Sequence, residues 1–201
     1  MKAFFRAAAK TAAVAAFCAV LGPLASAQAA DDKPWPQLDR VMGKADAPIT
    51  IIEYASLTCP HCAEFAEKTL PKLKSDWIDT GKAKLIYRDF PLDGRALAAA
   101  MVSQCSGDRY FSFLDAFYSS QKIWGTAPDA ISALKNVGKL GGLSDKQVDD
   151  CLNNRDLMKQ IQDRKKDGAD RYNLEATPSF VIKGKVYSGD IAYDDFVKLL
   201  K

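Results

Sequence analysis

The sequence contains a single histidine, His61, among 201 residues, and five cysteines. A structural zinc site usually needs four nitrogen or sulfur ligands, so any such site would have to draw mainly on the cysteines. No internal repeat is present, and no low-complexity segment follows the first 30 residues. These absences argue against a repeat architecture and favour an ordinary globular fold.

The chain also lacks a strong excess of one charge once its first 30 residues are set apart. Residues 1–30 contain Lys2, Arg6 and Lys10 but no acidic residue. Of the 28 basic residues in the whole chain, 25 therefore remain, and they equal the 25 acidic residues in number. A net charge near zero and the lack of a basic stripe give no electrostatic reason to expect nucleic-acid binding.

No apolar run reaches the roughly 20 residues that a transmembrane helix needs. The longest run, from about Thr11 to Leu24, follows the basic start and precedes the small residues 25–30. A positive start, a short apolar centre and an A-x-A site are typical of a cleavable secretory signal peptide. We therefore expect residues 1–30 to be removed with Cys18 and the rest to be exported. An uncleaved anchor is the alternative.

Four cysteines remain after the expected cleavage: Cys59, Cys62, Cys105 and Cys151. Exported proteins meet an oxidising compartment, so these residues can form disulfides. Four cysteines allow three pairings, and the sequence alone does not fix which one forms. The close spacing of Cys59 and Cys62 favours a local pair, which would leave the other two for each other.

Hydrophobic patterning predicts strands near 41–42 and at 48–55, 84–90, 179–182 and 186–187. The segment 48–55 is apolar and β-branched nearly throughout, as expected of a strand buried on both faces. A helix should begin at Pro60, because proline suits the first helical position, and Pro71 should kink it. A last amphipathic helix is predicted from Ala192 to Leu200.

The segment from 94 to 172 is helical in pattern almost without interruption, with a capping-box sequence at Ser144–Gln147. Because strands lie on both sides of this block, a helical insertion within one α/β domain explains the order of elements. We therefore predict an α/β domain formed by residues 31–93 and 173–201, with an inserted helical subdomain at 94–172.

The motif Cys59-Pro60-His61-Cys62 carries the chemistry that the sequence predicts. In a C-x-x-C sequence at the start of a helix, the first cysteine lies near unpaired backbone N–H groups and the positive end of the helix dipole, which stabilise a thiolate. Pro60 fixes the helix start, and His61 can add a donor or a positive charge beside Cys59. The thiolate is the form that attacks a disulfide, so Cys59 should be reactive.

A C-x-x-C motif is also compatible with purely structural or metal-binding roles. It can be a permanent disulfide, or it can supply half of a zinc site. Zinc would need two more ligands, for which only Cys105, Cys151 and His61 are obvious candidates. Copper(I), which favours soft thiolates, is a further alternative. The buried strand before the motif and the proline-started helix after it favour redox chemistry.

At these residues the chain resembles the DsbA-like branch of the thioredoxin superfamily, including its ScsC-like members. Ile52-Glu53-Tyr54 followed by the CPHC motif is similar to the approach to the family's active site. Ala176-Thr177-Pro178-Ser179 resembles the loop with the family's cis-proline, and Arg88–Leu92 before a helical block is typical of bacterial members. The resemblance covers essentially the whole chain after residue 30 and implies a thioredoxin fold with an inserted all-helical subdomain.

The resemblance also implies roles for individual residues. Cys59 would be the nucleophile and Cys62 the resolving thiol. Pro178 would be cis and would leave the backbone of Thr177 free to pair with an extended substrate peptide. An isolated Thr-Pro pair would otherwise be taken as an ordinary trans turn. Glu53 matches an acidic residue beneath the active site that assists proton transfer at Cys62, with burial raising its pKa.

Alternatives remain for two of these implied features. Glu53 could instead be a strand-end carboxylate paired with a lysine. Cys105 and Cys151 resemble an extra pair found in the helical insertion of some members, which implies a structural disulfide, but two buried free thiols would also fit.

The function that the resemblance implies is a periplasmic thiol:disulfide oxidoreductase, most simply a disulfide donor, that needs no cofactor or metal. Its substrates would be reduced or misoxidised exported proteins, and a membrane partner of the DsbB type would recharge it. About 17 residues separate the expected cleavage site from the first good strand, too few for the dimerisation region of DsbC-type isomerases, so a monomer is expected.

Thr177 departs from the valine that usually precedes the cis-proline in DsbA oxidases. It therefore leaves open a ScsC- or DsbC-like isomerase or reductase, which a DsbD-type partner would keep reduced. A copper-binding thiol protein is the third hypothesis, from a different functional class.

Overall fold

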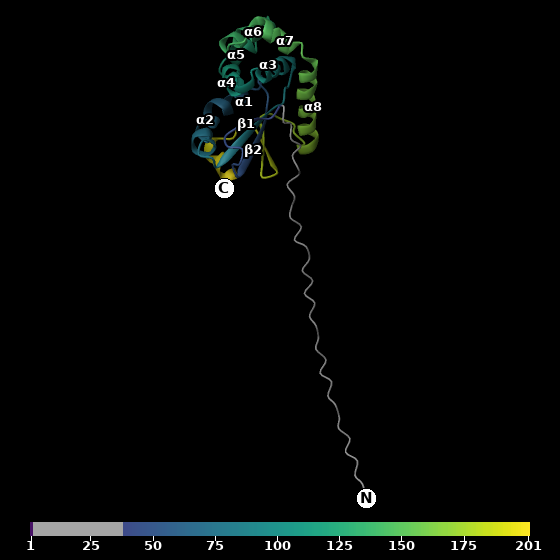
Figure 1. The fold of residues 1–201 in the computed structure, drawn as a ribbon. Coiled ribbons are helices and arrows are strands. Elements are labelled where there is room, and N and C mark those ends of the chain that lie inside the picture. The colour runs from purple at the N-terminus through teal and green to yellow at the C-terminus, as the bar shows by residue number, and fades with distance from the viewer. Residues whose placement is uncertain (2–37) are drawn as a thin grey trace.

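A five-stranded mixed sheet with the strand order β1-β3-β2-β4-β5 forms the centre of the protein (Figure 1). The computed structural model describes Met1 and residues 38–201, so the expected signal peptide, apart from Met1, lies outside the described residues. The strands are β1 (Arg40–Met42), β2 (Ile49–Ala55), β3 (Ala83–Asp89), β4 (Ser179–Ile182) and β5 (Lys185–Ser188). Strands β2 and β3 are parallel, and the other neighbouring pairs are antiparallel. Each predicted strand is confirmed, with ends that agree to within one residue.

Strand β2 is central because both of its faces are apolar. Ile51 is fully buried on one face, in a cluster with Phe65 and with Phe196 of helix α9 (Tyr193–Leu200). Ile52 is buried on the other face, in a separate cluster. The strand therefore carries apolar residues on consecutive positions rather than alternating ones, as predicted. The charged exception is Glu53, which is buried within the same strand.

The helix that follows Cys59 runs from Pro60 to Ile78 in four short segments. Two are α-helical, α1 (Pro60–Glu64) and α2 (Leu70–Leu73), and each is followed by a π-helical turn, at Phe65–Thr69 and Lys74–Ile78. Pro71 has no N–H to donate to the helical ladder. The wider turn before it, in which the Leu70 N–H donates to the Phe65 carbonyl, accommodates this gap. The disturbance predicted at Pro71 thus takes the form of π-helical turns.

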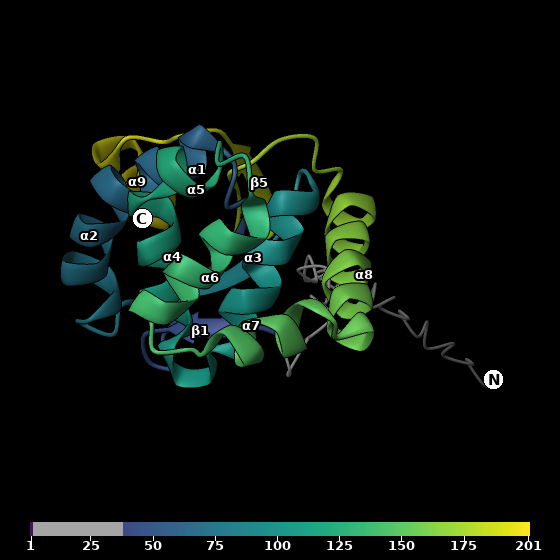
Figure 2. The same ribbon diagram turned by 90° about the horizontal axis from the view of Figure 1, so that it is seen from above.

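Every regular element between residues 94 and 172 is helical. The α-helices are α3 (Gly94–Cys105), α4 (Tyr110–Ser119), α5 (Gln121–Trp124), α6 (Ala130–Leu140), α7 (Asp145–Leu152) and α8 (Arg155–Tyr172), with a 3₁₀ turn at Gly107–Arg109. The predicted capping box at the start of α7 is present. Helices α3 to α7 gather at one end of the molecule and α8 runs along its side (Figures 1 and 2). The thioredoxin fold with a helical insertion is therefore confirmed.

The insertion shares its core with the rest of the fold. One buried cluster contains Ala55, Leu57 and Cys62 from around the C-x-x-C motif, together with Phe117 and Trp124 from the insertion. The boundaries predicted at residues 93/94 and 172/173 therefore remain a proposal about sequence organisation. Within residues 38–201, no helix combines the length and apolar character that a membrane span requires.

A buried ion pair also ties the insertion to the sheet. Asp89, the last residue of β3, accepts hydrogen bonds from Arg164 of α8 (2.7 Å) and Gln104 of α3 (2.8 Å), and Tyr110 of α4 lies 3.1 Å from both of its carboxylate oxygens. Asp89 and Arg164 are 2% and 0% exposed. Three helices of the insertion thus converge on one carboxylate at the end of a sheet strand.

Candidate functional site

The two cysteines of the CPHC motif lie at the start of α1, immediately after the loop that leaves β2. Cys59 is the N-cap residue, with φ −80° and ψ 121°, and Pro60 is the first helical residue. The Cys59 N–H donates to the Ser56 carbonyl at 3.0 Å, and the Cys59 carbonyl accepts from the Ala63 N–H at 3.2 Å. Both thiols are free, and both are buried. This places the first sulfur at the helix N-terminus, as the sequence predicted.

The surroundings of Cys59 favour its thiolate. Its pKa is lowered to about 5, and the hydrogen bond from the Cys62 thiol is the largest cause. The Thr177 side chain and the backbone N–H groups of Cys62 and His61 lower the pKa further, whereas burial raises it. The neutral thiol donates to the Thr177 carbonyl at 3.2 Å. The buried Thr177 hydroxyl has no hydrogen-bond partner among the described residues, so it is free to donate to the anion.

Cys62 has the opposite environment. Its side chain is fully buried, and burial raises its pKa far above the ordinary thiol value, with a further contribution from Cys59. The pair therefore consists of one thiol that ionises readily and one that stays protonated. This difference in pKa allows the Cys59 thiolate to attack a disulfide. It also allows the Cys62 sulfur to take up a proton when its own disulfide bond is broken.

Glu53 lies beneath this pair in the middle of the sheet. Its neighbours in register are Tyr87 on β3 and Phe180 on β4, and it is only 1% exposed. Desolvation raises its pKa to about 8. Its Oε2 atom has no hydrogen-bond partner among the described residues, and no ion pair with a lysine is present there. A cavity of about 10 Å³, lined also by Tyr118 and Asp115, lies against it, and such a volume is close to that of one water probe.

We expect replacement of Glu53 by glutamine to change how stability depends on pH. The folded-state pKa of about 8 exceeds the ordinary value of 4.5, so ionisation penalises the folded state increasingly as pH rises from 4.5 to 8. Relative to the variant, the wild type should lose about 2 kcal/mol of unfolding free energy between pH 5.5 and 7. Urea unfolding of the oxidised proteins at both pH values measures this.

The matched control for that experiment is Glu67→Gln, the same substitution at an exposed position. It should leave the pH dependence of unfolding unchanged. A difference between wild type and Glu53→Gln that stays constant with pH would contradict a raised pKa at Glu53.

His61 is arranged differently from the prediction. Its imidazole is 68% exposed, and Nδ1 lies 3.4 Å from a carboxylate oxygen of Glu64. The contribution of His61 at the sulfur of Cys59 is its backbone N–H. The imidazole itself contacts Glu64, three positions further along the helix.

Thr177 and Pro178 are 118 and 119 positions after Cys59 in the sequence but reach it in the fold. They immediately precede β4, which pairs with β2, so the strand pairing brings their loop beside the start of α1. The Thr177–Pro178 peptide bond is cis. The structure thus brings together Cys59, Cys62 and Thr177, as the resemblance implied.

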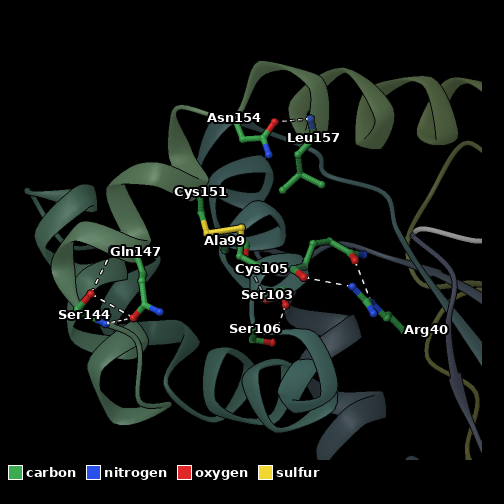
Figure 3. Close-up of a disulfide and its surroundings, with 11 residues drawn as sticks. Arg40, Ala99, Ser103, Cys105, Ser106, Ser144, Gln147, Cys151, Asn154 and Leu157 are labelled. Carbon is green, nitrogen blue, oxygen red and sulfur yellow. Dashed lines mark hydrogen bonds between the residues drawn. A yellow bond between two sulfur atoms is a disulfide. The ribbon is translucent and has the colours of Figure 1, made fainter.

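Cys105 and Cys151 form a disulfide between the end of α3 and α7, with their Cα atoms 6.2 Å apart (Figure 3). The bridge lies within the insertion and does not involve the CPHC motif. Among the described residues, no three His, Cys, Asp or Glu side chains gather in a group that could hold a metal ion.

Sequence reasoning did not identify Gln121. Its side-chain amide donates to the carbonyl oxygens of Leu57, at 2.8 Å, and Cys59, at 3.0 Å. A glutamine at the start of a four-residue helix, 62 positions from Cys59, offers no sequence signal for such a contact.

The chain is similar to several known proteins. A family model described as thioredoxin matches residues 37–201. The crystal structure of alpha-DsbA1 from Wolbachia pipientis is 34% identical, with 83% of this chain and 90% of that chain covered and a TM-score of 0.77. Disulfide bond formation protein D of Bacillus subtilis is 25% identical over 173 residues, which are 80% of this chain and 75% of that protein.

A further relative, from Rickettsia felis, has a name that places it among the protein-disulfide oxidoreductases. It is 30% identical over 158 residues, covering 78% of this chain and 56% of the relative. The chain spans about half the length of the Rickettsia relatives that it matches. Since the family model covers the chain from residue 37 to its end, and a DsbA structure aligns over most of both chains, the chain belongs to the thioredoxin family, in its DsbA-like branch.

Proposed function

We propose that the protein is a thiol:disulfide oxidoreductase that donates the Cys59–Cys62 disulfide to reduced cysteine pairs of exported proteins. The observation that carries this proposal is the asymmetry of the motif: the pKa of Cys59 is lowered to about 5, whereas that of the buried Cys62 is raised. A structural disulfide requires no such difference between its two sulfurs. Exchange requires it, because one sulfur must leave easily as an anion and the other must be protonated.

The reaction consists of two balanced exchange steps. A substrate thiolate attacks Cys59 Sγ of the oxidised protein, which forms a mixed disulfide and breaks the Cys59–Cys62 bond. Cys62 departs with the bonding electrons and takes up a proton. The second substrate thiolate then attacks the substrate sulfur of the mixed disulfide, and Cys59 leaves as a thiolate. The substrate loses two electrons, and the protein gains them.

The direction of electron flow follows from the stability of the product. The hydrogen-bond donors around Cys59 stabilise its thiolate, which exists only in the reduced protein. A stabilised reduced form makes the disulfide form the more reactive oxidant. The geometry therefore favours a disulfide donor over a reductant.

Glu53 would supply the proton that Cys62 needs. It is buried beneath the pair, and its pKa of about 8 keeps it protonated at neutral pH. A neutral carboxylic acid can donate a proton to the departing Cys62 sulfur and later recover one. Pro60 would fix the helix start, and the Thr177–Pro178 loop would offer its backbone to an extended substrate segment.

The setting of the reaction belongs to the same proposal. Cleavage of a signal peptide at residues 1–30 would deliver the protein to the periplasm, where a membrane partner of the DsbB type would reoxidise it. The protein would act as a monomer, and its substrates would be reduced or misoxidised exported proteins.

A disulfide isomerase or reductase is the second candidate, and the identity of the residue before the cis-proline, Thr177, favours it. A threonine at this position departs from the valine usual in DsbA oxidases. In that case a DsbD-type partner would hold the protein reduced.

The redox potential separates the two candidates, and equilibration with glutathione buffers measures it. A donor should have a potential well above the about −270 mV of thioredoxin, near the oxidising end of about −120 mV. A titration of thiolate absorbance in the reduced protein should give a pKa near 5 for one thiol. A thioredoxin-like potential would favour a reductase, and an ordinary thiol pKa would contradict disulfide exchange at Cys59.

A further inference from the structure

Helix α5 is a short element that the core holds in a fixed place. Its last residue, Trp124, is 2% exposed, and the indole N–H donates to the Phe117 carbonyl at 2.7 Å. Arg95 of α3 donates to the carbonyl of Ala127 just after the helix, at 2.7 Å. These contacts fix both the last turn of α5 and the segment that follows it, so the first residue of the helix, Gln121, has a fixed position as well.

Gln121 reaches from this position to the loop before α1. Its Nε2 donates to the carbonyls of Leu57 and Cys59, on either side of Thr58. Both partners are carbonyl oxygens, which only accept hydrogen bonds, so only the NH₂ end of the amide fits there. One side chain of the insertion therefore holds a peptide group before the reactive cysteine, Leu57–Thr58, and the peptide group directly after it, Cys59–Pro60.

The loop from Leu57 to Cys59 sets the geometry of the sulfur. Cys59 Sγ is stabilised by the backbone N–H groups of His61 and Cys62, two and three positions further along in the first turn of α1. Because Cys59 is the N-cap residue, rotation of its peptide group would move the sulfur relative to those donors. The Gln121 amide opposes such rotation. It also offsets the partial negative charge of the Cys59 carbonyl, which would otherwise destabilise a neighbouring anion.

We propose that Gln121 is a positioning residue for disulfide exchange: from the insertion, it fixes the Leu57 and Cys59 carbonyls and thereby holds Cys59 Sγ against the backbone donors of α1. The inference rests on the proposed function, because it assigns Gln121 a part in the same exchange. It also gives the helical insertion a role in tuning the redox pair, in addition to covering the core.

Two variants test this inference. Gln121→Leu removes the donor with a side chain of similar size, and Gln121→Glu keeps the shape but places an acceptor against two carbonyls. In both reduced variants, the thiolate titration of Cys59 should move upward by about one pKa unit, a tenfold change in ionisation. The equilibrium between the Cys59–Cys62 pair and glutathione at pH 7 should shift toward the Cys59–Cys62 disulfide by up to the same tenfold factor. The variants would then be weaker oxidants than the wild type.

The matched control is Gln162→Leu, the same substitution at an exposed position of α8. It should leave both readouts unchanged. If the Gln121 variants lose unfolding free energy while the Cys59 pKa and the glutathione equilibrium stay at wild-type values, Gln121 is merely structural and the inference is wrong. An ordinary thiol pKa in the wild type would instead contradict the proposed function itself, so the two failures are distinguishable.

Discussion

Replacing Cys59 by serine is expected to reduce disulfide exchange to the uncatalysed background, whereas replacing Cys62 by serine should leave the first attack intact. At pH 6 the Cys59 thiol, with a pKa of about 5, is mostly ionised, and the raised pKa of Cys62 keeps it protonated and unreactive. Cys62 is also fully buried. Nucleophilic reactivity at pH 6 should therefore reside in one sulfur only.

Reaction with glutathione disulfide at pH 6, followed by mass spectrometry, measures this difference. The Cys62→Ser protein should accumulate a stable mixed disulfide at Cys59, because no second thiol is present to release glutathione. The Cys59→Ser protein should gain no adduct. Both variants should fail to oxidise a reduced protein substrate, since neither can form the Cys59–Cys62 disulfide.

The Cys105–Cys151 disulfide provides an internal control for both variants. It is already bridged, and it lies within the insertion, so it should remain intact and carry no adduct under the same conditions. Rapid adduct formation in Cys59→Ser at pH 6, or an unreactive Cys62→Ser protein, would contradict the roles assigned to the two cysteines.

Much of the fold could be predicted because its signals are local. The consecutive apolar residues of β2 indicated a strand buried on both faces, and Pro60 marked the start of a helix. The helical pattern of residues 94–172 lay between strands and so predicted an insertion. The C-x-x-C motif identified the reactive pair because its chemistry depends on two residues that are three positions apart.

Other parts of the site depend on contacts that no local pattern encodes. The amide of Gln121 meets Cys59 across 62 positions, and Arg164 meets Asp89 across 75. The direction of the His61 side chain, toward Glu64 rather than Cys59, depends on which rotamer the first turn of the helix leaves open. Tertiary packing decides the first two, so the sequence alone could not supply them, whereas the His61–Glu64 contact is local to the helix.

The buried pair of Asp89 and Arg164 should contribute strongly to stability, and Asp89→Ala is expected to lower the unfolding free energy by about 3–5 kcal/mol. Removing the carboxylate leaves the guanidinium of Arg164, 0% exposed, without its nearer ion-pair partner at 2.7 Å and with Asp39 at 3.6 Å. It also leaves the Gln104 amide and the Tyr110 hydroxyl without their acceptor. Urea unfolding monitored by circular dichroism, with the Cys105–Cys151 disulfide intact, measures the loss.

The control is Asp163→Ala on α8, the helix that carries Arg164. It breaks an exposed ion pair with Lys159 and should change the unfolding free energy by less than about 0.5 kcal/mol. The double variant Asp89→Ala/Arg164→Met removes the guanidinium as well, so its loss should fall short of the sum of the losses in Asp89→Ala and Arg164→Met by about 1–3 kcal/mol. Strict additivity would show that the two residues do not act as a pair. Because Asp89 ends a sheet strand and Arg164 belongs to the insertion, coupling between them would show that part of the free energy joining the helical block to the thioredoxin sheet resides in this one contact.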